Sequence, residues 1–302
     1  MYDVIIIGSG PAGLTAGIYT TRASLKTLII AGSKWGGQLQ LTTLVENYPG
    51  FPDGIQGPDL MTAMKKQAEK FGTEIVDADF KSGDFSATPF KVSTSENTYE
   101  GKSVIIATGA DTRWLGAKGE EEKIGRGVSS CAPCDAPFFK DKNVIVVGGG
   151  DSAMEEALVL TKFAKEVTLI HRRDAFRASQ IMQDKVKNNP KIKVLFNSEI
   201  TEVLGQDRVT GVKISNNKTG EVTNLPIDGV FVAIGHIPNT NAFKGIHTDE
   251  GGFIKVYDHT KTNIDGIFVA GDVHDNHYKQ AITAAGFGCM ASLEAEKWLR
   301  EK

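Results

Sequence analysis

Two cysteines three positions apart are the residues of this chain whose spacing most directly suggests chemistry. Cys131 and Cys134 stand in the segment Ser129-Ser-Cys-Ala-Pro-Cys-Asp135, so a carboxyl group follows the second cysteine directly. A Cys-x-x-Cys spacing can close a small ring and can cycle between dithiol and disulfide. A carboxyl group beside a leaving thiolate can deliver or collect a proton. The motif therefore predicts a redox-active pair, with Asp135 as its proton carrier.

Zinc is the main alternative for such a pair. A structural zinc site needs four ligands, usually two such pairs. Only Cys289 remains among the three cysteines, and none of the six histidines forms a ligand pair beside the motif, so we expect no metal. A purely structural disulfide suits a reducing compartment poorly, and three cysteines in 302 residues fit such a compartment. We expect Cys289 to be a small buried apolar residue, and His274 and His277 to lie at the surface or in loops.

An internal repeat surrounds the cysteine pair. In each copy an apolar strand runs into a glycine-rich turn, then into a helix-like segment (14–22 and 154–163), then into a second apolar strand. The first glycine makes the tight turn, the second admits a pyrophosphate, and the small third residue lets helix and strand pack closely. The helix N-terminus favours the phosphate charge. Two such copies predict two Rossmann-like dinucleotide-binding units, with the turns Gly8-Ser9-Gly10-Pro11-Ala12-Gly13 and Gly148-Gly149-Gly150-Asp151-Ser152-Ala153.

Three further apolar strands that end in glycine or Gly-Asp, at 104–109, 230–235 and 267–272, suggest the domain layout. The first two flank the second copy of the repeat. The simplest arrangement is an α/β protein with one dinucleotide-binding domain inserted in the other. We expect the outer domain to span about 1–110 plus 242–302 and the inner one about 114–240.

The second strand of each copy ends differently. The inner copy ends in Ile170-His171-Arg172-Arg173, with Arg177 four residues on. Fixed positive charge there suits a ribose 2′-phosphate, which favours NADPH over NADH. The outer copy ends in Ile30-Ala31-Gly32, with neither an acidic residue nor an arginine. This argues against NADP in that unit but does not by itself identify another nucleotide.

Composition excludes several classes of protein. The chain has 34 basic and 37 acidic residues, a net charge of −3, so no basic excess suggests nucleic acid or a membrane surface as partner. No apolar run approaches the roughly 20 residues of a membrane span, and no basic segment opens the chain. We expect a cytoplasmic protein.

The motifs together resemble those of the low-molecular-weight thioredoxin reductases over essentially the whole chain. The stretches that carry the resemblance are Gly8-x-Gly10-x-x-Gly13, Gly36-Gly37-Gln38, Glu46-Asn47-Tyr48-Pro49-Gly50, Ala107-Thr108-Gly109, Cys131-x-x-Cys134-Asp135, Gly148-x-Gly150-Asp151-Ser152-Ala153, His171-Arg172-Arg173, Phe176-Arg177-Ala178-Ser179, Gly271-Asp272-Val273 and Gln280-Ala281.

The resemblance implies two domains of the three-layer ββα, FAD/NAD(P)-binding type. It implies FAD in the outer domain, held by the residues Gly8, Ser9, Gly10, Pro11, Ala12, Gly13, Gly36, Gly37, Gln38, Asn47, Thr108, Gly109, Gly271, Asp272, Lys279, Gln280 and Ala281. It implies NADPH in the inner domain, held by Gly148, Gly150, Asp151, Ser152, Ala153, His171, Arg172, Arg173, Arg177, Ile234 and Gly235.

The resemblance also implies the division of labour at the cysteines. Cys134 would accept electrons from the flavin, Cys131 would attack the disulfide of thioredoxin or a thioredoxin-like protein, and Asp135 would move the proton. Arg126 would lie at the surface where the partner docks. The family further implies a homodimer, and two domain arrangements that interconvert about the connections near 111–113 and 241–244.

Two residues depart from the family pattern. The family often has threonine where Pro133 stands and glycine where Ala136 stands, and a proline removes one backbone N–H. Such a change could alter the redox poise or the choice of partner. The alternatives are the same machinery serving a peroxiredoxin- or glutaredoxin-like partner, and an NADPH–ferredoxin-type flavoprotein, which needs no cysteine pair. A ferredoxin- or flavin-dependent thioredoxin reductase would lack the NADPH motifs found here.

Overall fold

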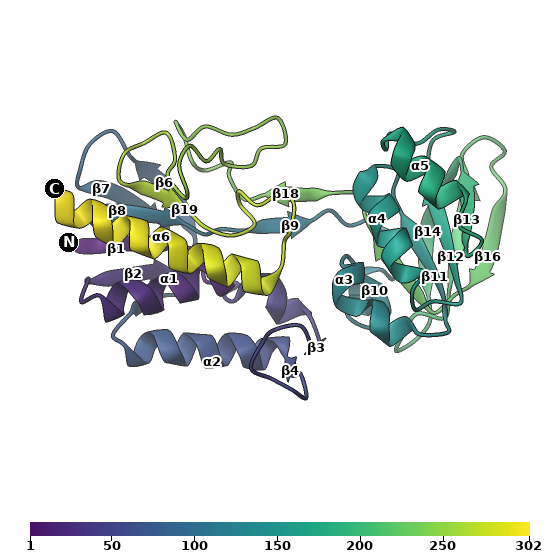
Figure 1. Ribbon diagram of the computed structural model, residues 1–302, viewed down its shortest axis with the longest axis horizontal. Helices are drawn as coiled ribbons and strands as arrows, with labels where there is room; N and C mark the ends of the chain where they lie inside the picture. Colours follow the sequence, from purple (N-terminus) through teal and green to yellow (C-terminus); the bar gives the residue numbers. More distant parts are fainter. The chain divides into compact units, whose positions relative to one another are not determined.

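The internal repeat forms two parallel sheets that share one strand order. The computed structural model describes residues 1–302, and the chain divides into two units, Met1–Asp111 with Ile237–Lys302, and Thr112–His236. The second unit is thus inserted into the first (Figure 1). The chain returns to the first unit after His236, a few residues earlier than the boundary near 240–242 that the sequence suggested.

The elements of the first unit come from both ends of the chain. The segments β9 and β18, where the chain passes between the units, pair as a two-stranded sheet. The elements are β1 Tyr2–Ile7, α1 Pro11–Arg22, β2 Thr27–Ile30, η1 Gly37–Leu41, β3 Leu44–Val45, β4 Ile55–Gln56, α2 Gly57–Lys70, β5 Glu74–Val76, β6 Phe80–Asp84, β7 Phe90–Thr94, β8 Thr98–Ile106, β9 Ala110–Thr112, β18 His236–Pro238, β19 Ile267–Val269 and α6 Ala281–Glu301.

The elements of the second unit are continuous in sequence. They are η2 Glu121–Lys123, β10 Val128–Ser129, α3 Ala132–Asp135, η3 Ala136–Phe139, β11 Asn143–Val147, α4 Asp151–Leu160, β12 Glu166–His171, α5 Gln180–Lys187, β13 Ile192–Phe196, β14 Ser198–Leu204, β15 Gly211–Asn216, β16 Val222–Pro226 and β17 Gly229–Val232.

The two central sheets correspond strand by strand. The first runs β5-β2-β1-β8 with β19 paired to β8, and the second runs β13-β12-β11-β17-β10. All of these pairs are parallel. The predicted α/β class with two Rossmann-like units is confirmed.

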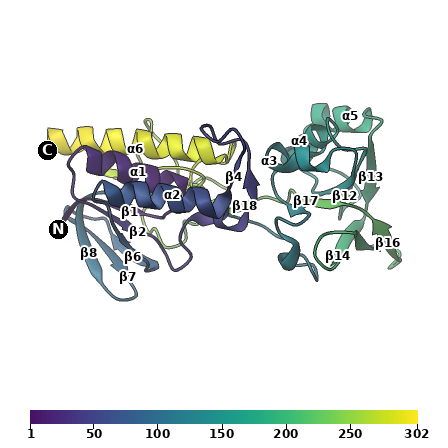
Figure 2. The ribbon, with the colours of Figure 1, turned by 90° about the horizontal axis from the view of Figure 1, so that it is seen from below.

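Each central sheet is covered on both faces, which gives three layers in each unit (Figure 2). In β1, Val4 and Ile6 pack toward the helices α1, α2 and α6, whereas Ile5 and Ile7 pack toward Phe85 and its neighbours on the opposite face. That third layer comprises β6, β7 and the first half of β8, which are antiparallel. Strands buried on both faces need apolar side chains at every position, which explains the apolar run from Val4 to Ile7 in β1.

The second unit repeats this plan. In β11, Val144 and Val146 pack toward the helix side, and Ile145 and Val147 pack toward the antiparallel sheet β14-β15-β16. The helices α4 and α5 cover the first face. Each glycine turn therefore follows the end of a strand whose last four residues are buried, with side chains packed on both faces.

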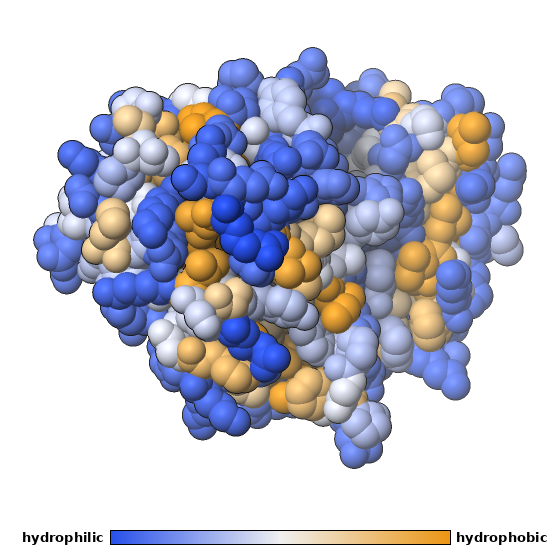
Figure 3. Space-filling model, turned by 60° about the vertical axis from the view of Figure 1, so that its left-hand side comes forward, coloured by the Kyte–Doolittle hydropathy of each residue, from blue (hydrophilic) through white to orange (hydrophobic).

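One face of the molecule shows hydrophilic side chains with several apolar patches between them (Figure 3). No helix has both the length and the apolar composition that crossing a membrane requires.

Helices α1 and α6 pack closely along their length, and small residues make this possible. The two ribbons lie side by side in Figure 1, and the hydroxyl of Ser292 donates to the carbonyl of Ala16 at 3.2 Å. A Cβ atom added to Gly288 would lie 2.2 Å from the carbonyl oxygen of Ala12, which is backbone and cannot move aside. A Cβ added to Gly286, on the same helix, would meet nothing within 4 Å. The two glycines of α6 therefore have different roles.

We predict opposite effects of alanine at these two positions. Gly288→Ala forces the helices apart and should lower the free energy of unfolding by about 2 kcal/mol. Gly286→Ala, the matched control, should raise it by about 0.5 kcal/mol, because alanine favours a helix over glycine. Urea unfolding followed by circular dichroism measures both, and equal effects of the two substitutions would contradict the packing described.

Candidate functional site

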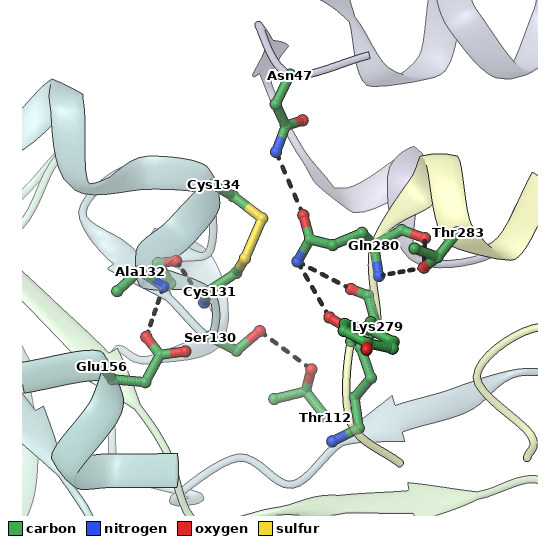
Figure 4. The surroundings of a disulfide bond; sticks show 12 residues. Asn47, Thr112, Ser130, Cys131, Ala132, Cys134, Glu156, Lys279, Gln280 and Thr283 are labelled. Carbon is green, nitrogen blue, oxygen red and sulfur yellow. Dashed lines mark hydrogen bonds between the residues drawn. A yellow bond between two sulfur atoms is a disulfide. The ribbon is translucent and has the colours of Figure 1, made fainter. Parts of the chain in front are cut away.

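The predicted cysteine pair is closed as a disulfide. The S–S distance of Cys131 and Cys134 is 2.06 Å and their Cα atoms are 5.3 Å apart (Figure 4). The short helix α3 begins directly after Cys131, and the backbone N–H groups of Cys134 and Asp135 donate to the Cys131 carbonyl at 3.2 and 3.1 Å. Both cysteines are half-buried. The pair therefore lies in a hydrogen-bonded turn, and both cysteines remain partly accessible to solvent.

Asp135 is suited to carry a proton for this pair. Burial raises the pKa of its carboxyl group, and a hydrogen bond with the Ser129 hydroxyl offsets part of that rise. A carboxyl group with a raised pKa keeps its proton closer to neutral pH, as a proton donor must. The Ser129 hydroxyl oxygen also accepts the N–H of Cys131 at 3.1 Å. Ser129 thus connects the acid to the pair, a contact that sequence reasoning missed although the hydroxyl residue stands two positions before Cys131.

The first glycine turn admits no side chain at two of its glycines. A Cβ at Gly8 would lie 2.2 Å from the Ala107 carbonyl oxygen, and one at Gly13 would lie 1.9 Å from the Gly8 carbonyl oxygen. The φ of Gly8 is +115°, which glycine adopts readily. At Gly10 a Cβ would meet nothing within 4 Å, and α1 begins at the next residue without a side-chain cap. Open space and uncapped N–H groups at the start of α1 fit a pyrophosphate.

Ser9 links this turn to the predicted segment Gly36-Gly37. Its hydroxyl donates to the Ala31 carbonyl at 2.8 Å, at the end of β2, and accepts the Gly36 N–H at 2.9 Å. As a result, a Cβ at Gly37 would lie only 3.5 Å from the Gly10 Cα. The structure therefore brings the first glycine turn and the Gly36-Gly37 segment together beside the open space at Gly10.

Asp272 brings an unpaired acceptor to the same turn. Gly271, with φ +79°, packs against Ala12, so Asp272 follows at the end of β19 beside the start of α1. The Oδ1 atom of Asp272 is enclosed and has no hydrogen-bond partner. Burial raises the pKa of this carboxyl to about 6, and the charge of Asp275 adds to the rise. A buried acceptor without a donor is costly unless a ligand supplies one, so this atom fits a sugar hydroxyl.

The remaining predicted residues of the first unit lie in η1, in loops and at the start of α6. The Asn47 side-chain amide donates to Gln280 Oε1 at 3.3 Å, and Gln280 caps α6, which begins at Ala281, in a reciprocal box with Thr283. Asp275, which sequence reasoning missed, shapes the preceding turn, because its carboxylate accepts three backbone N–H groups, among them that of Lys279. The other contacts are those of Gln38 with Asp111 at 3.1 Å, Thr108 with Asn239 at 2.8 Å, and Gly109 with Asn239 at 3.0 Å.

The second glycine turn repeats the close approach of the first. A Cβ at Gly148 would lie 2.4 Å from the Ala233 carbonyl oxygen and 2.5 Å from the Ala153 Cβ, whereas Gly150 again meets nothing within 4 Å. Asp151 and Ser152 form the exposed first turn of α4. The Asp151 carboxylate accepts the backbone N–H and the hydroxyl of Ser179 at 3.0 and 2.7 Å, which lowers its pKa. This contact fixes the segment that carries Arg177 against the turn.

Three arginines gather at the end of β12. Arg172, Arg173 and Arg177 are exposed, and the N–H of Arg177 donates to the Gly149 carbonyl at 2.8 Å. All three charges help to lower the pKa of buried His171, although burial is the main cause. None of the three guanidinium groups pairs with a carboxylate within 4.0 Å. A pyrophosphate-type turn with unpaired cations beside it fits a dinucleotide that carries an additional phosphate.

The other predicted residues of the second unit lie on other segments of the chain. Ile234 and Gly235 follow β17, and the Gly235 carbonyl accepts the Arg113 N–H at 3.0 Å. Arg126 is exposed in the turn before β10.

His274 and Cys289, for which the sequence predicted no chemical role, lie beside aromatic side chains. His274 lies in a loop as expected, but its Nε2 atom is enclosed and its ring packs edge-on against Phe287 at 4.4 Å. Cys289 is only half-buried, and its proximity raises the pKa of the Tyr19 hydroxyl. The prediction that Cys289 is a small buried residue is therefore wrong, because its side chain is only partly enclosed.

Comparison with known proteins gives a consistent family. Residues 2–288 match the family model described as pyridine nucleotide-disulphide oxidoreductase. A thioredoxin reductase of Mycolicibacterium smegmatis is 51% identical over 100% of this chain and 98% of its own length. The structure of thioredoxin reductase from Giardia duodenalis is 45% identical, with a TM-score of 0.95, and 99% of each chain is covered.

The chain belongs to the thioredoxin reductase family. A bifunctional thioredoxin reductase/thioredoxin of Mycobacterium leprae is also similar, 50% identical over 100% of this chain and 66% of that protein. Thioredoxin reductases are FAD- and NADPH-dependent flavoproteins with a redox-active disulfide, so FAD and NADPH are the cofactors of this oxidoreductase. The enclosed Asp272 oxygen and the open space at Gly10 and Gly150 are compatible with two bound dinucleotides.

We predict that the affinity for FAD depends on pH through Asp272. Hydroxyl donation favours the ionised carboxylate, so bound FAD should lower the pKa of Asp272 from about 6. Below that pKa the apoprotein must first release a proton, and FAD should bind about tenfold more weakly near pH 5 than near pH 7.5. Fluorescence titration of apoprotein with FAD measures this, with Asp272→Asn as the control that should lose the dependence. An affinity that is independent of pH in the unmodified protein would contradict the assignment.

Proposed function

We propose that this chain is an NADPH-dependent thioredoxin-disulfide reductase that transfers two electrons through FAD and the Cys131–Cys134 disulfide to thioredoxin. The observation that carries this proposal is the closed disulfide next to the partly buried acid Asp135. The bifunctional relative, whose name joins a reductase to a thioredoxin, supports thioredoxin as the partner. An NADPH–ferredoxin-type enzyme would have no use for the disulfide.

Each nucleotide is assigned to one unit. We assign FAD to the first unit, where Asp272 offers its enclosed oxygen to the sugar chain and the start of α1 faces the pyrophosphate. We assign NADPH to the second unit, where the start of α4 receives the pyrophosphate and Arg172, Arg173 and Arg177 receive the 2′-phosphate. The remaining residues of each predicted set would line the same two sites.

The chemistry divides between the cofactor and the cysteines. Bound FAD supplies what the side chains lack, because it accepts the two hydride electrons of NADPH and passes them to a disulfide. With two electrons and two protons, the Cys131–Cys134 bond becomes two thiols. Cys131, as thiolate, attacks one sulfur of the thioredoxin disulfide and forms a mixed disulfide. Cys134, as thiolate, then attacks Cys131, which restores the internal disulfide and releases reduced thioredoxin.

Asp135 exchanges protons with this pair. It follows Cys134 in α3, and its raised pKa lets it give a proton to a departing thiolate and take one from a thiol. The Ser129 hydroxyl, bonded to both Asp135 and the Cys131 backbone, keeps the acid in place. Arg126, exposed in the same unit, is available for a polar contact with the partner.

We further propose a homodimer in the cytoplasm. Large apolar side chains on the outer face of the first unit are exposed, and three of them recur along one stripe of α6. A second copy that covers this face would remove apolar surface from water. The scarcity of cysteines suits a reducing compartment. The exposed apolar residues are Tyr19 on α1, and Ile282, Met290 and Leu293 on α6.

The first prediction of this proposal concerns turnover. Purified holoenzyme should oxidise NADPH in the presence of oxidised thioredoxin, and Cys134→Ser should abolish this turnover, because the electrons cannot reach Cys131 without its partner. Flavin bleaching by NADPH, measured separately by absorbance, should survive in the variant as the control. Undiminished turnover of thioredoxin by Cys134→Ser would overturn the role of the pair.

The second prediction concerns the choice of nicotinamide cofactor. Replacing Arg172 and Arg173 by alanine removes two cations opposite the 2′-phosphate and should raise KM for NADPH by about 100-fold. KM for NADH should change little, because NADH carries no such phosphate. Steady-state kinetics with both nucleotides decides the matter, and an unchanged preference for NADPH would remove the assignment.

A further inference from the structure

The carboxylate of Glu156 contacts the backbone of the redox motif from a neighbouring helix. Glu156 lies in the middle of α4, and its Oε2 atom accepts the backbone N–H of Ala132, the residue after Cys131 (Figure 4). Helices α3 and α4 pack through small buried residues, Ala132 on the first and Ala153 and Ala157 on the second. No motif in the sequence pointed to Glu156. The helix that begins at the second glycine turn is thereby bonded to the disulfide turn.

The backbone donors around Cys131 are all engaged by oxygen acceptors. This matters because a cysteine thiolate is usually stabilised by backbone N–H groups or by nearby positive charge. Here those N–H groups are directed to other acceptors. Cys131 donates to the Ser129 hydroxyl, Ala132 to Glu156, and Cys134 and Asp135 to the Cys131 carbonyl, whereas Pro133 has no N–H.

Covalent geometry also limits how far the Glu156 carboxylate can lie from the sulfur. The nitrogen of Ala132 is four bonds from Cys131 Sγ, so the bonded carboxylate oxygen is within about 7 Å of that sulfur. At such a distance, in a half-buried site, a like charge disfavours ionisation of its neighbour by about tenfold or more. The nearby Glu156 carboxylate and the engagement of the N–H groups by other acceptors therefore both disfavour the Cys131 thiolate.

We propose that Glu156 is a positioning residue that holds α3 against α4 and keeps the cysteine pair, once reduced, in its protonated dithiol form near neutral pH. The inference rests on the proposed function, because only a pair that is reduced in turnover has thiols to ionise. In the exchange step, the thiolate of Cys131 must form before it can attack. The Cys131 thiol therefore loses its proton during the exchange step. A carrier such as Asp135 takes up this proton, because its raised pKa lets it accept and donate a proton closer to neutral pH.

The titratable groups on the packed elements of this unit are few. The pair's own helix carries Asp135, and η3 and β10 carry none. Besides Glu156, α4 carries Asp151, which is bonded to Ser179, and Glu155, and both of these side chains are exposed. Glu156 is thus the residue of α4 that bonds to the motif.

The test measures how alkylation of the reduced pair depends on pH. The holoenzyme is reduced anaerobically with dithiothreitol, the reductant is removed, and iodoacetamide labelling of Cys131 and Cys134 is followed by peptide mass spectrometry from about pH 5 to pH 10. Glu156→Gln keeps an acceptor of the same shape for the Ala132 N–H and removes only the charge. Glu199→Gln removes an exposed carboxylate elsewhere in the same unit and is the matched control.

We expect the midpoint of the alkylation profile to fall by about one pH unit in Glu156→Gln, so that labelling well below the midpoint is about tenfold faster. The profile of Glu199→Gln should match that of the unmodified protein. A Glu156→Gln profile that also matches it would overturn the inference while leaving the proposed function intact. If reduction exposes no new reactive thiol in the unmodified protein, with Cys289 as the internal standard, the proposed function fails instead.

Discussion

The close approach of backbone to backbone at the two glycine turns is the constraint on which the structure depends. At Gly8 and Gly148 a Cβ would lie 2.2 and 2.4 Å from a carbonyl oxygen of the neighbouring strand segment, so only glycine permits the turn. Each turn begins a helix at the end of a buried strand. It therefore determines where the N-termini of α1 and α4 lie, and with them both phosphate sites. Through the hydrogen bond between Glu156 and the Ala132 N–H, α4 also contacts the cysteine turn.

Each unit also contains one partly buried carboxyl group whose pKa is raised, and the two have different uses. Asp272 has an enclosed oxygen without a protein donor, which suits an acceptor for a ligand hydroxyl. Asp135 is hydrogen-bonded to Ser129 and adjoins a cysteine, which suits a carrier of protons. Desolvation is the main cause of the rise in both cases, whereas the available hydrogen-bond partner distinguishes their roles.

Local patterns in the sequence predicted much of this protein. Three features are each confined to a short segment of sequence: the strand–turn–helix repeat, the cysteine pair and the arginines after Ile170. In the structure the repeat forms the expected strands and helices, the cysteines form a disulfide, and the arginines follow the end of β12. Both helices begin earlier than expected: α1 begins at Pro11, because proline is compatible with the first helical turn, and α4 begins at Asp151, because a carboxylate is favourable at a helix N-terminus. The contacts of Ser9, Asp275 and Glu156 were not predictable, since each depends on a segment that only the fold brings near. The exact return of the chain after His236 likewise follows from packing and not from composition.

The most direct test of the account is the electron capacity of the protein. We expect anaerobic titration with NADPH, followed by flavin absorbance and thiol counting, to consume two equivalents per chain, one for FAD and one for the Cys131–Cys134 disulfide. The same titration of Cys134→Ser should stop at one equivalent with the flavin fully reduced. Uptake of one equivalent by both proteins would contradict the claim that the disulfide lies on the electron path.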